Sequence, residues 1–169
     1  MAFTFSKISG TLLNSNATTI SVTNIPNTYD ALMFYLSVRS DLNAPRTNVV
    51  ISLNNNTSNY IRSEIYLEND SFGIEANYTN NTTGGMNASQ ANSGLFTNIV
   101  GFLPNYKTSN DKVAWIRNGQ PNNTSASYGL WQTFYAWKDS SVVSSIYATA
   151  GSGNIVAGSE LIVYGIKYS

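Results

Sequence analysis

The sequence of 169 residues contains no cysteine and no histidine. Their absence excludes disulfides, cysteine nucleophiles, zinc sites built on Cys and His, haem held by a histidine, and histidine general acids or bases. Only carboxylates, lysines, tyrosines and serines remain for catalysis, and most familiar enzyme sites cannot be built from them. We therefore expect a protein without enzymatic activity, metal or cofactor.

Charge is also scarce. Nine Lys or Arg balance nine Asp or Glu, and charged residues make up 11% of the chain, against about 25% in ordinary domains. Such a surface offers no basic patch to a nucleic acid. No run approaches the roughly 18 apolar residues of a membrane helix, and the first residues do not resemble a signal peptide. We expect neither nucleic acid nor membrane as a partner.

Neutral side chains supply the polarity instead. Asn, Ser and Thr together account for 61 of the 169 residues, whereas 42% are hydrophobic and 12% aromatic. This apolar content lies above the range typical of disorder. The length corresponds to about one domain, and we expect residues 1–169 to form a single one.

Apolar residues recur with a period of two, and Asn, Gly and Pro clusters separate the segments, which indicates short strands and turns. No window shows a convincing helical stripe. The pattern predicts an all-β fold, either a sandwich, a jelly roll or a barrel. We expect strands near 3–8, 18–23, 31–39, 47–53, 60–67, 72–78, 95–102, 112–117, 129–138, 141–149 and 160–167.

The segment 61–67 shows the clearest alternation. Ile65 and Leu67 belong to one face and Arg62 and Glu64 to the other, so we expect the apolar face to point inward and the charged face into solvent. A glycosidase would need two carboxyl groups at a set separation across a cleft. We interpret the nearby carboxylates as ordinary solvated groups rather than a catalytic pair. They are Glu64, Glu68, Asp70 and Glu75.

Residues 77–94 read NYTNNTTGGMNASQANSG and contain almost no apolar side chain. The stretch is too long for an ordinary connection. It is either a solvated loop or an arm that contacts a neighbouring subunit. The candidate contact residues are Asn80, Asn81, Met86, Asn87 and Gln90.

Several aromatic residues could stack on sugar rings, but at strand periodicity they more often fill the space between sheets or subunits. We favour this packing role and keep glycan contact as the alternative. The aromatic candidates are Tyr60, Tyr106, Trp115, Tyr128, Trp131 and Trp137.

Four sequence motifs, in order along the chain, resemble a family of small tailed-phage virion proteins. The first is IPNTYDAL at 25–32, followed by LSVRS at 36–40. NNNTSNY at 54–60 is similar to an Asn-rich loop of that family, with Asn56 where an Asp is usual. PNYK at 104–107, with Lys112, is similar to a mid-chain segment. IVAGSELIVYGI at 155–166 resembles the family's ending, with Val156 replacing an aromatic residue.

The resemblance implies a β-sandwich of jelly-roll type and a place on the surface of a phage particle, after synthesis in the host cytoplasm. Because folded-looking sequence begins without a stalk or coiled coil, we expect a capsid decoration (cement) protein. Its partners would be the major capsid protein and itself, as a homotrimer. The alternative is a head- or tail-fibre module that recognises a host-surface glycan.

Overall fold

Twelve strands make up the regular structure of residues 3–121 and 128–168, the part that this computed structural model describes, and no helix occurs there. The all-β prediction is confirmed, and each of the eleven expected strands overlaps an observed one. The strands are β1 (Phe3–Leu12), β2 (Thr19–Val22), β3 (Ala31–Val38), β4 (Arg46–Leu53), β5 (Tyr60–Glu68), β6 (Ser71–Tyr78), β7 (Thr82–Asn87), β8 (Thr97–Pro104), β9 (Lys112–Gln120), β10 (Gly129–Trp137), β11 (Ile146–Ala150) and β12 (Glu160–Tyr168).

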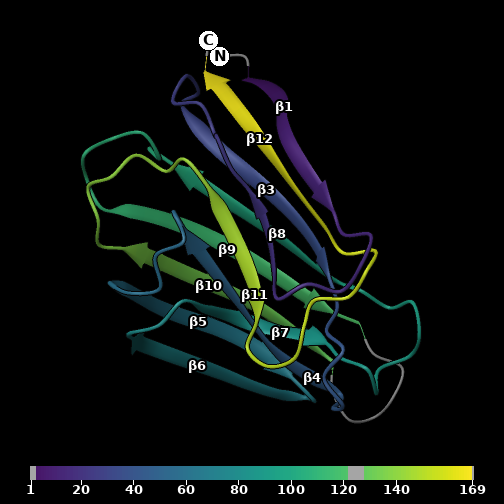
Figure 1. Cartoon of the computed structure of the whole chain (residues 1–169). Coiled ribbons are helices and arrows are strands. Elements are labelled where there is room, and N and C mark those ends of the chain that lie inside the picture. Colours follow the sequence, from purple (N-terminus) through teal and green to yellow (C-terminus); the bar gives the residue numbers. More distant parts are fainter. Residues whose placement is uncertain (1–2, 122–127, 169) are drawn as a thin grey trace.

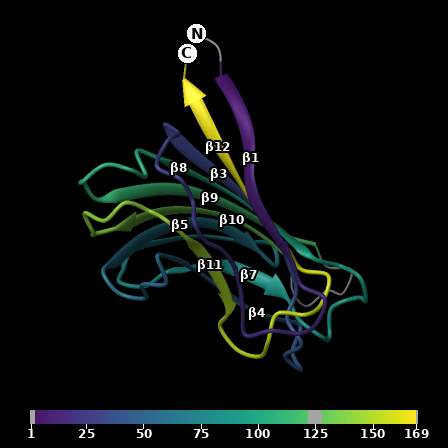
Figure 2. The same ribbon diagram turned by 45° about the horizontal axis from the view of Figure 1, so that its top comes forward.

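The strands form two antiparallel sheets of unequal size. The large sheet has the order β1-β12-β3-β8-β9-β10-β5-β6 and the small sheet the order β2-β11-β4-β7. The small sheet lies over one face of the large sheet (Figures 1 and 2), which gives the layered arrangement of a β-sandwich. With four strands against eight, it covers that inner face only in part. Residues 3–121 and 128–168 contain no helix that could span a membrane.

The core lies between the sheets. Phe34 and Leu36 of β3, Leu161 of β12 and Ile51 of β4 are at most 1% exposed. The expected alternation at 31–39 is thereby confirmed, with Met33 and Tyr35 half-buried on the opposite face. Burial of side chains of this size supplies most of the favourable free energy of folding.

Asparagine is abundant partly because the turns require it. Among residues 3–121 and 128–168, all eight non-glycine residues with positive φ are Asn or Asp, the residues that tolerate the left-handed region best. The β5–β6 turn has φ of 48° at Asn69 and 65° at Asp70, as a two-residue hairpin loop of type I′ requires at both positions.

The two ends of the described chain lie side by side at the edge of the large sheet (Figures 1 and 2). Edge strand β1 pairs with β12, with Phe3 opposite Tyr168. Their rings meet edge to face with centroids 5.6 Å apart.

The expectation of one loop over 77–94 is wrong for its centre. Residues Thr82–Asn87 form β7, the edge strand of the small sheet, paired with β4. Asn118 of the large sheet donates from Nδ2 to the carbonyl oxygens of Thr83 at 2.8 Å and Gly85 at 2.9 Å. Hydrogen bonds to its backbone and the burial of its residues therefore stabilise this strand, although it has almost no apolar side chains.

Candidate functional site

The outer face of the large sheet, which points away from the small sheet, is largely apolar. Phe72 of β6 is 69% exposed, Leu130 of β10 is 62% exposed and Trp115 of β9 is 51% exposed. Strand pairing places all of these side chains on one face, because residues directly opposite each other point to the same side. Other exposed apolar residues of this face are Phe3, Phe5, Ile65, Leu67, Ile74, Val100, Val113, Phe134 and Tyr168.

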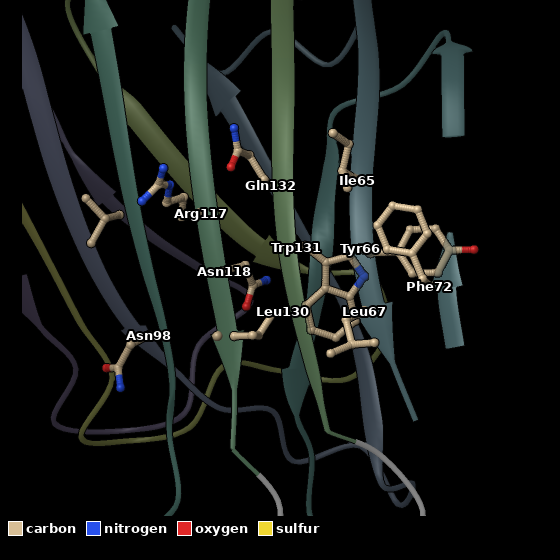
Figure 3. A pocket seen from close by; sticks show the side chains of 12 residues that line it. Ile65, Tyr66, Leu67, Phe72, Asn98, Arg117, Asn118, Leu130, Trp131 and Gln132 are labelled. Carbon is tan, nitrogen blue, oxygen red and sulfur yellow. The ribbon is translucent and has the colours of Figure 1, made fainter. Parts of the chain in front are cut away.

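Two hollows of similar volume lie on this outer face. One, of about 460 Å³, lies near β5, β6 and β10, where Figure 3 shows Ile65, Leu67, Phe72 and Leu130. The other, of about 440 Å³, is lined by residues of β1, β12 and β8. Hollows lined by large apolar side chains fit protruding apolar side chains of a partner. The lining residues of the second hollow are Phe3, Phe5, Phe102, Ile166 and Tyr168.

Charge is almost absent from this face. In the described part of the large sheet, the strand registers place Lys7, Arg117 and Glu160 there, and no other charged residue. Arg117 pairs with Gln132 near the middle of the face. A surface this neutral and apolar is typical of permanent contacts between subunits.

Strand β5 faces the opposite way from the sequence expectation. Arg62 is 7% exposed and Glu64 is 4% exposed on the inner face, whereas Ile65 is 41% and Leu67 39% exposed on the outer face. The prediction that the charged side faces solvent is wrong. The reason lies in the strand order: β5 and β6 end the large sheet, near β7, where the cover of the small sheet ends. Ion pairs fill the inner side of β5 and β6 in place of apolar side chains from the small sheet.

Arg62 organises the charged groups on that inner side. Its Nη1 donates to Glu64 at 2.7 Å, its Nη2 to Glu75 of β6 at 2.9 Å, and its Nε to Asn80 at 2.7 Å. The ring of Tyr78 lies 4.9 Å from the guanidinium carbon. Each of its three nitrogens therefore donates at least one hydrogen bond within the chain.

Next to Arg62 lies a small cleft of about 180 Å³, which we name the Arg–Glu cleft. Arg46 of β4 pairs with Glu68 of β5 at its mouth and lies 6.0 Å from the ring centre of Trp131. The floor is the backbone of β7. The lining residues are Arg46, Asn48, Arg62, Glu64, Tyr66, Glu68, Glu75, Thr82, Gly84, Gly85 and Trp131.

Burial raises the pKa of the Glu64 carboxyl above its ordinary value, and hydrogen bonds from Thr133 and Arg62 oppose the rise. Thr133 donates to Oε1 at 2.6 Å and Arg62 to Oε2 at 2.7 Å. This carboxyl is thus fully hydrogen-bonded. Across residues 3–121 and 128–168, no group of three or more acidic, His or Cys side chains is placed to hold a metal ion.

The predicted contact residues of 77–94 do not share one surface. Met86 and Asn87 are fully buried and Asn81 is 7% exposed, so their side chains cannot meet a partner in the folded chain. Asn80 is half-buried against Arg62. Gln90 is exposed, and its Nε2 lies 3.2 Å from Oδ1 of Asn43.

The connection after β7 is fixed by one buried cation. Arg39, which is 9% exposed, donates to the backbone carbonyl oxygens of four residues between β7 and β8. Such a clamp holds the connection in a single conformation. The accepting residues are Ser89, Ala91, Asn92 and Leu95, at 2.6 to 3.3 Å.

The aromatic candidates divide between core and surface. Tyr60, Tyr106, Trp131 and Trp137 are at most 6% exposed, so most of the surface of each side chain packs inside the folded chain. Tyr60 stacks with Trp137 at a centroid distance of 6.1 Å.

The other two aromatic candidates are accessible. Trp115 lies on the outer face, 5.7 Å from the ring of Phe102. Tyr128 is half-buried, and its hydroxyl donates to Asp70. Sequence reasoning missed the outer-face residues Phe72, Ile74 and Leu130, although their apolar character was visible.

No protein-family model matches the chain, and no curated protein matches it. Among solved structures, CG-16, a homodimeric agglutinin from chicken liver, aligns with 75% of this chain and 98% of its own, with 6% identity and a TM-score of 0.23. A TM-score this low indicates neither a shared fold nor a shared function.

Proposed function

We propose that the protein is a structural subunit of a tailed-phage particle, a jelly-roll capsid decoration protein that forms a homotrimer and binds the major capsid protein. The apolar outer face of the large sheet is the observation that carries this proposal. A soluble chain does not leave such a face in water, because exposed apolar patches beyond a few hundred Å² mark interaction sites. The sequence resemblance supplies the setting on the phage particle.

A second copy of the chain is the occupant that fits the outer face best. Eight strands about 4.8 Å apart, each about eight residues long, give a face of roughly 900 Å². Stable interfaces bury about 800 Å² on each partner. The face carries almost no charge to steer a charged partner. Identical copies are also present together from synthesis onward, and in a closed three-fold ring each copy would share this face between its two neighbours.

The oligomeric mass in solution tests the assembly. We expect light scattering to give three times the chain mass of 18.4 kDa. Phe72→Lys with Leu130→Lys should yield a folded monomer, since both side chains are more than 60% exposed in one copy. Val142→Lys is the matched control, because Val142 is exposed but lies outside the large sheet. A monomeric unmodified protein would contradict the assembly.

The place on the particle is tested separately. We expect purified protein to bind undecorated capsids, and mass spectrometry of intact particles to count hundreds of copies. Tens of copies or fewer, without capsid binding, would favour the alternative of a head- or tail-fibre module. The exposed Trp115 supports that alternative only weakly, because its neighbours on the outer face are apolar.

A further inference from the structure

The Arg–Glu cleft contains polar groups that are held in place but not fully used. Glu75 accepts from Arg62 through Oε2, and within the described residues its Oε1 has no hydrogen-bond donor. The indole N–H of Trp131 likewise donates to no described residue. Figure 3 shows its nitrogen on the side of Tyr66, the residue opposite it on β5. Both residues line the cleft, so its lining includes one acceptor and one donor without a partner among the described residues.

The charges of the cleft define what it can bind. Arg46 and Arg62 face Glu64, Glu68 and Glu75, so the lining carries one net negative charge. Both arginines are already paired with carboxylates. An anion would therefore be repelled by Glu68 and Glu75 at the mouth. A neutral ligand with several hydroxyl groups matches, because hydroxyls donate to carboxylates and accept from N–H groups.

The backbone of β7 forms the floor of the cleft, next to the space that a ligand would occupy. A Cβ on Gly84 would lie 2.8 Å from Cγ of Trp131, and one on Gly85 would lie 2.7 Å from Oε1 of Gln120. Gly84, which also has a φ of 76°, is the position where glycine lets β7 pack directly against Trp131. The cleft has a volume of about 180 Å³, whereas pockets for drug-sized ligands begin at roughly 300 Å³. The cleft therefore has room for a small ligand, such as a single sugar ring.

We propose that the Arg–Glu cleft binds one neutral sugar residue, with hydroxyl groups on Glu75 and Glu68 and the indole N–H of Trp131 as a donor. The cleft opens between the sheets, away from the outer face. The inference therefore does not rest on the proposed assembly. It would give the protein a glycan-binding function in addition to a structural one.

Saturation-transfer NMR tests this proposal, with methyl glucoside, methyl galactoside, methyl mannoside and N-acetylglucosamine as probes, next to a printed array of neutral glycans. We expect transfer from at least one of these sugars. Glu75→Gln should weaken its binding about tenfold, because a hydrogen bond to a charged group is replaced by a neutral one. Asp111→Asn, at an exposed carboxylate outside the cleft, should bind like the unmodified protein.

A second variant keeps the test decisive if Glu75→Gln perturbs folding. Asn48 is exposed at the mouth of the cleft, so Asn48→Trp should fill the opening, leave the circular dichroism spectrum unchanged and abolish sugar binding. Binding by Asn48→Trp at unmodified strength would overturn the site, and so would the absence of binding to all four sugars and to the array. The oligomeric mass, measured on the same samples, reports on the assembly independently.

Discussion

Arg39 donates a hydrogen bond of 2.9 Å from its guanidinium group to the backbone carbonyl oxygen of Ala91. The two residues are 52 positions apart in the chain, and this bond ties the start of the β7–β8 connection to the end of β3. The polar connection is therefore an ordered part of the fold, although its composition is typical of a free loop.

The clamp predicts that Arg39→Met loosens this connection. The variant loses hydrogen bonds from a charged group to four carbonyl oxygens, and we expect a loss of about 2 kcal/mol or more in the free energy of unfolding. Hydrogen exchange should accelerate at the amides of Ala91 and Leu95, which bond within the connection. Lys138→Met, at an exposed position, should leave both amides protected. Unchanged protection in Arg39→Met would contradict the clamp.

Asn87→Ala should destabilise the protein, although Asn87 lies in a stretch that the sequence predicts to be a solvated loop or a contact arm. Asn87 is fully buried, and its Nδ2 donates to the carbonyl oxygens of Leu95 and Pro121. The carbonyl oxygen of Pro121 would lose this donor and that of Leu95 would keep the one from Arg39, at a cost of about 1 to 3 kcal/mol. Urea denaturation measures the change. Asn92→Ala, at an exposed side chain of the same segment, should stay within about 0.5 kcal/mol of the unmodified protein.

Leu161→Asp should abolish folding. Leu161 is fully buried in the core, with β1 and β3 on either side of its strand, and an unpaired carboxylate there costs several kcal/mol or more against a total stability of about 5 to 15 kcal/mol. The test is the soluble yield and the far-ultraviolet circular dichroism spectrum. Lys167→Asp, at an exposed position of the same strand, is the comparison and should fold. A folded Leu161→Asp protein would show that β12 is not part of the core.

The raised pKa of Glu64 predicts how stability depends on pH. The folded protein holds this proton more tightly than the unfolded chain, so between the ordinary value of 4.5 and the raised folded pKa the unfolded state binds fewer protons. The free energy of unfolding therefore falls as pH rises through this range. The urea concentration at the midpoint of unfolding should fall with rising pH between pH 4 and 7. We expect this fall to be less steep in Glu64→Gln than in the unmodified protein. Identical slopes in the two proteins would remove Glu64 as the cause.

Alternation allowed the strands to be predicted but not their orientation. The period of two at 31–39 and 60–67 shows which residues share a face, and both strands form. Which face is buried depends on the strand order, and β5 lies next to the edge strand β6 of the large sheet. Ile65 and Leu67 consequently face outward. The residues of a single strand do not indicate where that strand lies in the sheet.

The candidate sites were predictable to different degrees. Trp131 and Trp137 are buried, and their strand periodicity already favoured a packing role for both, because large aromatics at that spacing fill cores. Strand β7 was missed because its stability comes from the backbone pairing with β4 and from Asn118, partners distant in sequence. The Arg–Glu cleft joins residues of β4, β5, β6, β7 and β10, and no single segment of the sequence indicates it.

The pairing of Phe3 with Tyr168 has a consequence for protein engineering. Because the two ends meet at one edge of the large sheet, a short glycine-rich linker can join them with little strain, and neighbouring ends are what circular permutation requires. New ends opened at the exposed Asn69–Asp70 turn would then emerge at the opposite margin of that sheet. A peptide displayed on this scaffold could therefore be moved from one margin to the other while every strand keeps its neighbours.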